Sequence, residues 1–317
     1  MKRRLCLLLL LALALSLAAC GGEHTIEETD SPVSIVTTVF PAYDFARQIA
    51  GERASVSLLV PPGAESHSFE PTARDLLRIQ NCTLFFCNGG ESEAWVDELL
   101  EDQRVETLMM LDCVEALEEE TKEGMQEIRG QEEHEHEEEE GPEYDEHVWT
   151  SPVNAILICQ ALCERLCRLD PAGAEEYRTN LERYRAELEA LDAAFRSTVE
   201  QGKTRTVVFA DRFPLRYFTE EYGLDYFAAF PGCADDTEPA ARTVAFLIDK
   251  VREEKIPAVF TIEFSNEKMA DVICEDTGCR KLLFHSCHNV SAEELKSGVS
   301  YLELMRRNVD ALKEALG

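Results

Sequence analysis

Two patterns of apolar and polar positions alternate along most of the chain. Short runs rich in β-branched and aromatic residues are separated by segments in which apolar residues recur every three or four positions. The first pattern predicts strands and the second predicts amphipathic helices. Because the two kinds of segment alternate, the sequence predicts an α/β fold, with mostly parallel sheet and covering helices.

The alternation runs through the first part of the chain and starts again after residue 202. The predicted strands are residues 34–39, 54–60, 82–87, 105–111, 204–210, 224–230, 258–263 and 281–285. The predicted helices are residues 42–51, 72–80, 93–102, 152–168, 211–223, 238–255 and 265–278, and a last helix opens at a capping box formed by Ser291 and Glu294.

One long helix is predicted between the two halves. Apolar residues three or four positions apart form a single stripe from Tyr177 to Val199, which indicates a helix of about 30 residues, or about 45 Å. A coiled-coil seam between subunits is the alternative, but a spine packed against both halves is simpler, and we expect a monomer. The predicted organisation is a first lobe over residues 34–169, a linking helix over 170–201 and a second lobe over 202–317. Ligands of such folds lie at the carboxyl ends of strands, which here means the cleft between the lobes.

The chain begins with an export signal. Residues 1–19 combine a basic start with an apolar stretch and end in "LAAC", a pattern that resembles the bacterial lipobox, in which the cysteine is lipidated. A plain signal with an incidental cysteine is the alternative. We expect Cys20 to anchor the protein to the outer face of the cytoplasmic membrane, with residues 20–33 as a flexible tether.

The composition is strongly acidic. The chain has 62 acidic and 31 basic residues and a formal net charge of −31, which argues against nucleic acid as a partner and favours cations. Residues 113–146 are rich in glutamate and predict a loop that contains His134 and His136. Cysteines recur every four residues at Cys159, Cys163 and Cys167, as expected for small buried side chains, so we favour free thiols over a disulfide framework.

Three of the seven histidines occupy positions suited to ligand binding. His67 follows a predicted strand, His147 lies between the acidic loop and a helix start, and His285 ends the last predicted strand, with His288 three residues further on. A single histidine of this kind is more often a surface or core residue. Three that face one cleft predict a metal site, because neutral imidazole is the commonest protein ligand for zinc.

The motifs "SIVTTVFPAYDFARQIAG", "PPGAESHSFEPTARDL", "HVWTSP", "YGLDY", "TEPA" and "YLELMRRNVDAL" extend this argument. Together they resemble the metal-binding lipoproteins of ABC importers for zinc and manganese. The resemblance covers nearly all of the chain after the signal. It implies two lobes bridged by a spine helix, a metal ion held between them, and delivery of that ion to a membrane permease. It also implies that an acidic, histidine-bearing loop is typical of the zinc-handling members.

The resemblance assigns ligands residue by residue. His67 in "HSFEP" matches the first family ligand and His147 in "HVWTSP" matches the second. The third ligand position falls on Ala210, which cannot bind a metal through its side chain, and the fourth falls on His285. We therefore expect His67, His147 and His285 to bind the metal. A fourth position is left to water or to one of Asp211, Glu263, Cys233, Cys287 and His288, with Asp211 and Glu263 slightly favoured.

The ligand type decides between metals and between functions. A site made mostly of imidazole favours Zn²⁺ over Mn²⁺. A zinc-dependent hydrolase with Glu70 or Glu263 as general base is an alternative, but the chain has no H-E-x-x-H and no nucleophile elbow, so we expect a carrier and not an enzyme.

Some family members are described as adhesins, and no residue here supports that reading. His134 and His136 belong either to a weak second zinc site or to a solubilising insertion.

Overall fold

The computed structural model describes residues 31–317, apart from residue 66 and residues 103–104, 127–142, 233 and 235–238. The predicted signal, Cys20 and both histidines of the acidic loop, His134 and His136, lie outside the described residues. Within the described part of the chain, no helix combines the length and the apolar character that crossing a membrane requires.

The first sheet has four parallel strands in the order β2-β1-β3-β4. The apolar run of β1 is mostly buried and that of β3 is wholly buried, as expected for strands of a parallel sheet. The helices that follow these strands are short and amphipathic. The bounds are β1 Val33–Thr37, α2 Phe40–Ala50, β2 Ala54–Leu58, α3 Ala73–Gln80, β3 Leu84–Cys87, α4 Trp95–Asp102 and β4 Thr107–Met109.

The second sheet repeats this arrangement, with four parallel strands in the order β6-β5-β7-β8. The predicted α/β fold with mostly parallel sheet is therefore confirmed. The bounds are β5 Thr206–Phe213, α7 Arg216–Tyr222, β6 Asp225–Pro231, α8 Ala241–Glu253, β7 Ala258–Thr261, α9 Lys268–Thr277 and β8 Arg280–Leu283. The division into lobes at residues 169 and 202 stays a prediction.

Strand β5 differs from the sequence prediction in a way that matters for the site. The strand was expected to end at Ala210, but it continues to Phe213, with a shift of register between Phe209 and Arg212. Pro214 follows the strand, and α7 begins only at Arg216. The extra residues bring Asp211 and Arg212 into the sheet, at the end where ligands of parallel sheets bind.

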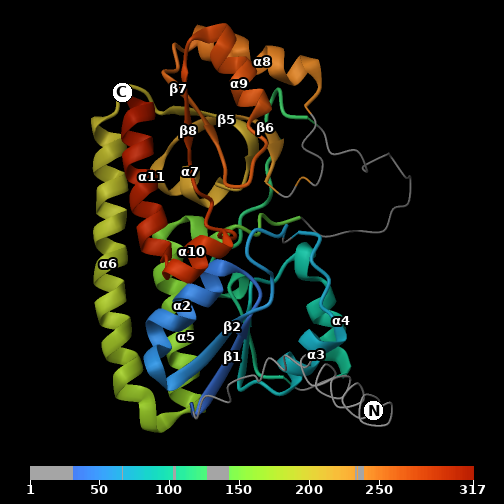
Figure 1. Cartoon of the computed structure of the whole chain (residues 1–317). Helices are drawn as coiled ribbons and strands as arrows, with labels where there is room; N and C mark the ends of the chain where they lie inside the picture. The colour runs from blue at the N-terminus through green and yellow to red at the C-terminus, as the bar shows by residue number, and fades with distance from the viewer. Residues whose placement is uncertain (1–30, 66, 103–104, 127–142, 233, 235–238) are drawn as a thin grey trace, which may run out of the picture. The chain divides into compact units, whose positions relative to one another are not determined.

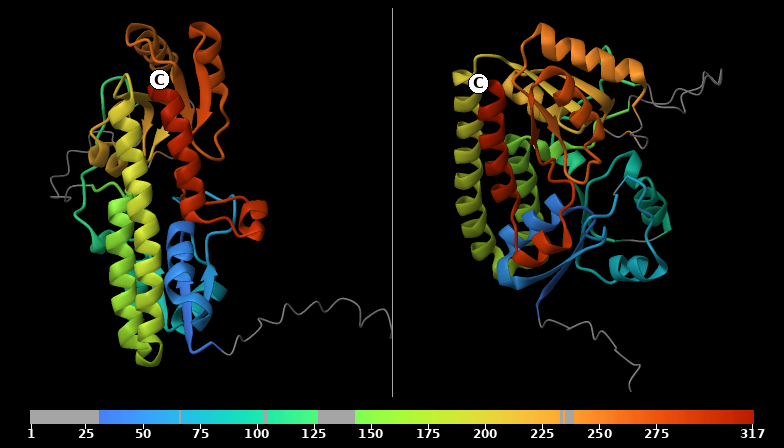
Figure 2. Two further views of the ribbon diagram at one scale, coloured as in Figure 1. Left: turned by 90° about the vertical axis from the view of Figure 1, so that its left-hand side faces the viewer. Right: turned by 45° about the horizontal axis from the view of Figure 1, so that its top comes forward.

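Two long helices run beside each other, α5 (Pro152–Leu169) and α6 (Ala174–Gln201) (Figures 1 and 2). Helix α5 begins as predicted, with the Ser151 hydroxyl accepting a hydrogen bond from the amide of Asn154. Helix α6 buries the predicted stripe from Tyr177 to Val199, with only Leu181 half-buried. It packs against α2, α5 and α11. The predicted spine helix is therefore the helix that these three helices share as a neighbour.

The last predicted helix is two helices, α10 (Ala292–Ser297) and α11 (Tyr301–Leu316). The Ser291 and Glu294 capping box forms as predicted. Gly298, with φ of 77°, ends α10 in a left-handed conformation that favours glycine, and α11 then packs beside α6 (Figure 2). Single turns of 3-10 helix lie at Gly51–Arg53, Glu91–Glu93, Leu111–Cys113, Val148–Thr150 and Pro171–Gly173.

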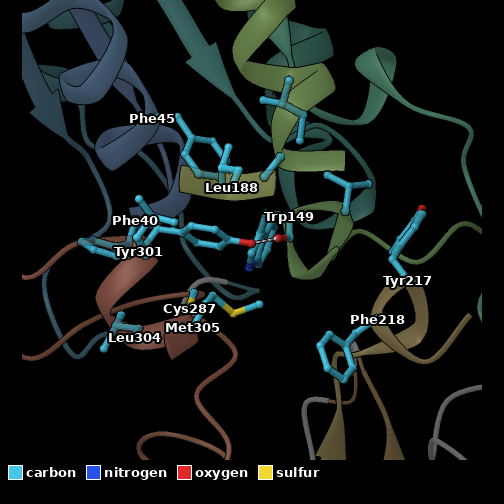
Figure 3. Close-up of a cluster of buried hydrophobic side chains, with 14 of the residues drawn as sticks. Phe40, Phe45, Trp149, Leu188, Tyr217, Phe218, Cys287, Tyr301, Leu304 and Met305 are labelled. Carbon is cyan, nitrogen blue, oxygen red and sulfur yellow. Dashed lines mark hydrogen bonds between the residues drawn. The ribbon is translucent and has the colours of Figure 1, made fainter. Parts of the chain in front are cut away.

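The largest buried cluster joins residues of α2, α5, α6, α11 and both sheets. Its centre includes Phe40, Phe45, Trp149 and Tyr301, all fully buried (Figure 3). The Tyr301 hydroxyl donates to the Trp149 carbonyl over 2.7 Å. The indole nitrogen of Trp149 in turn donates to the carbonyl of Ser286 over 2.9 Å. These bonds fix the short segment around residue 149 against the turn that follows β8.

Candidate metal centre

His67 lies in the loop between β2 and α3. Its Nδ1 is 3.0 Å from Oε1 of Glu65, two residues earlier in the chain. The imidazole side chain is only 6% exposed, and its Nε2 is buried with no hydrogen-bond partner among the described residues. A buried nitrogen without a partner costs free energy unless something binds it. The first predicted ligand therefore presents an unused nitrogen to the interior.

His147 repeats this arrangement from a different segment, directly before the turn Val148–Thr150. Its Nδ1 is 3.2 Å from Oδ1 of Asp145, and its amide donates to the same oxygen over 2.8 Å. The side chain is fully buried, and its Nε2 also has no hydrogen-bond partner in the part of the chain that is described. Carboxylates that accept from one ring nitrogen fix the tautomer and leave the other nitrogen free to bind a metal.

The third imidazole of the cluster is His288. Its ring centroid lies 4.8 Å from that of His67 and 5.3 Å from that of His147. One ligand atom from each of the three histidines lies within 4.8 Å of the others, and no other such group of metal-ligating residues occurs in the described part of the chain. Three nitrogens at this separation fit the coordination shell of one ion after small rotations of the rings.

The structure differs from the expected ligand set at the third histidine, because it brings His288 and not His285 to this cluster. The His285 amide donates to Oδ1 of Asn308 in α11, and its carbonyl accepts from Nδ2 of the same residue. Its Nδ1 accepts from the amide of Cys287 over 2.9 Å. Cys287 has a φ of 65°, a left-handed conformation that reverses the chain. That reversal directs His288 toward the other two histidines.

Among the other candidate ligands, Cys233 lies outside the described residues, and neither Glu263 nor Asp211 belongs to the histidine cluster. Glu263 lines the same cavity as the three histidines, but its carboxylate accepts from the amides of Ser286 and His288 over 2.7 and 3.2 Å. Asp211 lines a neighbouring cavity instead, together with Ala210. The first carboxylate thus supports the turn that carries His288, and the second does not face the histidines.

Arg212 lies close in sequence to Ala210, the position at which the family resemblance left a ligand missing. It lines the histidine cavity two residues beyond Ala210 on the same strand. Its Nη2 lies 3.1 Å from Oε2 of Glu65, whose other oxygen contacts His67. A guanidinium does not lose its proton in proteins and cannot bind a metal. Arg212 therefore acts on the site through Glu65.

Asn289 joins the two segments that carry His67 and His288. Its Nδ2 donates to the carbonyls of Pro61 and Ala64 over 2.8 and 2.9 Å, and its side chain is buried. Sequence reasoning did not identify Asn289 or Arg212, since neither is a metal ligand. The sequence did offer one signal of the site: an acidic residue stands two positions before both His67 and His147, a spacing that allows a carboxylate to contact the ring.

The electrostatic environment differs among the histidines. Burial lowers the pKa of His147, but Asp145, Glu146 and Glu119 raise it more, so the net shift is upward. Burial, followed by the neighbouring His67 and His147, holds the pKa of His288 well below its usual value. Hydrogen bonding to His67, together with Arg212, holds the pKa of Glu65 well below its ordinary range. A metal needs neutral imidazoles, so His288 is ready to bind without losing a proton.

The three histidines open into a cavity of about 230 Å³. This volume suits an ion with a few waters and is small for an organic substrate. The cavity is lined by Gly63, Ala64, Glu65, His67, His147, Arg212, Pro214, Gly232, Ile262, Glu263, Phe264, Ser286, His288 and Asn289.

A comparison with protein families is decisive for the assignment. Residues 35–315 match the model of the ZnuA family, described as the periplasmic component A of a zinc-uptake complex. The chain belongs to this family. The matched residues include all three histidines of the candidate metal centre and both sheets apart from the first two residues of β1.

Known ZnuA-family proteins agree in sequence and in fold. The chain is 31% identical over 319 residues to the high-affinity zinc uptake system protein ZnuA of Bacillus subtilis, covering 98% of this chain and 97% of that one. It is 30% identical over 315 residues to the zinc-binding lipoprotein AdcA of Streptococcus pneumoniae, and it spans only 61% of the length of that relative. The crystal structure of the Zn(II)-bound ZnuA-like domain of that AdcA matches with a TM-score of 0.73 at 28% identity, covering 90% of this chain and 98% of the domain.

These names are those of zinc-binding and zinc-uptake proteins, and none is the name of an enzyme. The comparisons give no support to the hydrolase alternative. The expected family of metal-binding proteins is confirmed.

Proposed function

We propose that this protein binds Zn²⁺ outside the cytoplasm and delivers it to the membrane permease of an ABC importer. The observation that carries the proposal is the group of three imidazoles, two of them with a buried Nε2 that has no partner among the described residues. The names of the relatives and the periplasmic description of the family support the same metal and the same compartment.

His67, His147 and His288 are the proposed ligands, and His288 replaces His285 in the set expected from the sequence. Three neutral imidazoles favour zinc over manganese, which prefers carboxylates and other oxygen ligands. Glu65 and Asp145 fix the orientation of two of the rings, and the amide bonds to Glu263 hold the turn of the third. The chain thus supplies a site whose ligands are held in place by their own neighbours.

The ligands come from both sheets. His67 follows β2 of the first sheet, and His147 lies between β4, the last strand of that sheet, and α5. His288 follows β8 of the second sheet. A bound ion would therefore link the ends of the two sheets and stabilise the arrangement in which they meet. Release to a permease requires that this link be broken, which protonation or a competing ligand of the permease can do.

Attachment to the membrane through Cys20 is part of the proposal. The lipobox-like "LAAC" and the lipoprotein name of the streptococcal relative support it. A lipid anchor would keep the carrier near its permease and raise the rate of encounter. Metabolic labelling of the expressed protein with a fatty-acid analogue would give a labelled band for the wild type and none for Cys20→Ala.

The test of zinc binding is a titration of the exported chain against a chromophoric zinc chelator, with Mn²⁺ as competitor. We expect one tight zinc site and manganese binding that is weaker by at least about 100-fold, which corresponds to about 2.7 kcal/mol. The matched variants His288→Asn and His285→Asn then separate the two candidate ligands. Tighter binding of manganese than of zinc would overturn the proposed function.

A further inference from the structure

Two cysteines of the second sheet region lie close together outside the metal centre. The sulfurs of Cys274 and Cys279 are 3.4 Å apart. All nine cysteines in the described part of the chain, these two included, are free thiols. Neither of the two lines the histidine cavity, so the metal site does not explain why they meet.

The backbone holds these cysteines together. Cys274 lies in the last turn of α9, and Gly278, with φ of 76°, ends that helix in a left-handed conformation. The Gly278 amide donates to the Cys274 carbonyl over 2.9 Å. Cys279 follows and precedes Arg280, which begins β8 and pairs with β7. The turn therefore returns the chain over the end of α9 and keeps the two side chains adjacent.

We propose that Cys274 and Cys279 are a site of covalent modification, at which an intramolecular disulfide forms in an oxidising compartment. A disulfide needs a sulfur separation of about 2.05 Å, so the sulfurs must approach by roughly 1.4 Å, which rotation of the two side chains can supply. Bacterial proteins acquire such bonds outside the cytoplasm. The family description places this chain's relatives there.

The reaction is a thiol–disulfide exchange with a disulfide-bearing oxidant, such as oxidised glutathione. Cys279 lines an open groove beside α8 and β8 together with Arg252 and Lys255, so it is the sulfur that a reagent reaches. Its thiolate attacks one sulfur of the oxidant, which forms a mixed disulfide and releases the first reduced thiol. The sulfur of Cys274 then loses its proton to solvent, attacks Cys279 in the mixed disulfide and releases the second reduced thiol.

The order of attack follows from the environment of the two sulfurs. Burial raises the pKa of Cys274 to about 12, and its hydrogen bond with Cys279 adds to that shift. A protonated sulfur is a poor nucleophile, so Cys274 acts second, when the mixed disulfide is already beside it. The product ring spans the C-terminal end of α9 and the start of β8, and so fastens that helix to the edge strand of the second sheet.

The test is incubation of the native full chain with oxidised glutathione, followed by alkylation and peptide mass spectrometry. We expect the tryptic peptide that contains both Cys274 and Cys279 to escape alkylation and to be lighter by two hydrogen atoms than the reduced peptide. The variant Cys274→Ser should stop at the mixed disulfide of Cys279 with glutathione, and Cys279→Ser should leave Cys274 as an alkylated thiol. Recovery of both cysteines as alkylated thiols in the wild-type chain would overturn the proposal.

The chain offers a matched control in Cys163 and Cys167 of α5. These are four residues apart on one helix, where Cβ atoms are about 5–6 Å apart and too distant for a disulfide without distortion. They should remain thiols under the same conditions. Linkage of Cys163 to Cys167 to the same extent would show that the reagent crosslinks unfolded chain. A thermal melt of each variant before oxidation checks that its fold is intact. The prediction does not depend on zinc and holds for protein with or without the ion.

Discussion

His67 and His147, which lie in segments after strands of the first sheet, are held differently from His288, which follows the second sheet. His67 and His147 each have a carboxylate two residues earlier, and it contacts the Nδ1 of the ring. His288 has Ser286 at the same spacing, and its amide is bonded to Glu263. Around His67 and His147 the carboxylates thus contact the ring itself, while Glu263 contacts the amide of His288.

This difference predicts that the two halves of the candidate site respond to different substitutions. Removing a carboxylate from Glu65 or Asp145 frees a ring to rotate, because the ring loses the partner of its Nδ1, and also removes a bond to the histidine amide. The His288 ring depends on the conformation of the turn after β8, including the left-handed Cys287. The predictions below test this contrast, beginning with the largest expected effect.

Removal of a ligand should have the largest effect. His67→Ala, His147→Ala and His288→Ala should each lower zinc affinity by more than about 100-fold, above the 10- to 100-fold range of outer-shell changes. His285→Asn is the control, because an amide oxygen can accept the Cys287 amide that Nδ1 accepts in the wild type. It should change the affinity by less than about threefold. Competition with a chromophoric chelator measures all four, and equal losses in the His285 and His288 variants would refute the assignment.

Removal of an orienting carboxylate should come next. Asp145→Asn and Glu65→Gln are expected to weaken zinc binding by about 10- to 100-fold. The effect should be larger at Asp145, whose side chain is 2% exposed, than at Glu65, whose side chain is 45% exposed, since water can replace an exposed partner. The absorption spectrum of the Co²⁺-substituted protein reports on ring orientation. Spectra and affinities identical to the wild type would remove these carboxylates from the site.

Loss of main-chain support should have a smaller effect. Asn289→Ala removes two hydrogen bonds to the loop that carries His67. At about 1 kcal/mol for each bond, divided between folding and metal binding, we expect zinc affinity to fall by roughly 2- to 10-fold. Measured thermal stability should fall in the metal-free protein as well. If stability falls while affinity is unchanged, the residue holds the fold and does not position the ligand.

A fall in pH should lower zinc affinity gradually, and this is the smallest of the expected effects. The pKa of His147 is raised above its usual 6.5, so protons compete with zinc there at a higher pH than at an ordinary histidine. Affinity should be full well above that pKa and should fall as the pH drops through it. Since Asp145 is the main group raising the pKa, Asp145→Asn should move the fall to lower pH. A fall at the same pH in both proteins would contradict this cause. Titrations between pH 8 and pH 5.5 measure it.

The sequence predicted most of the fold because its signals are local. The strands and helices of both sheets follow from apolar periodicity, and the cap at Ser291 from its spacing to Glu294. The misplaced boundaries have particular causes. Strand β5 continues past Ala210 because the register shift before Arg212 lets the strand bend and keep pairing with β6. Gly298 interrupts the last predicted helix, which rested on the capping box at its start.

The candidate site was predictable where the motif and the ligand coincide. His67 lies in a compact motif whose Gly63, Ala64 and Glu65 also line the cavity, and His147 begins the motif "HVWTSP". At the third position two histidines lie three residues apart, and the choice between them depends on the φ of Cys287 and on the partner that Asn308 offers to His285. Both are properties of tertiary packing, which a pattern of residues does not show. Arg212 was overlooked for the same reason, since it reaches the site only through the extended β5.

The most direct test of the account is a crystal structure of the zinc-loaded protein with anomalous data collected at the zinc edge. The account predicts one strong anomalous peak about 2.0–2.1 Å from a nitrogen of each of His67, His147 and His288. It predicts that His285 keeps its hydrogen bonds to Cys287 and Asn308. A peak bound to His285, or one that lacks His288 as a ligand, would contradict it.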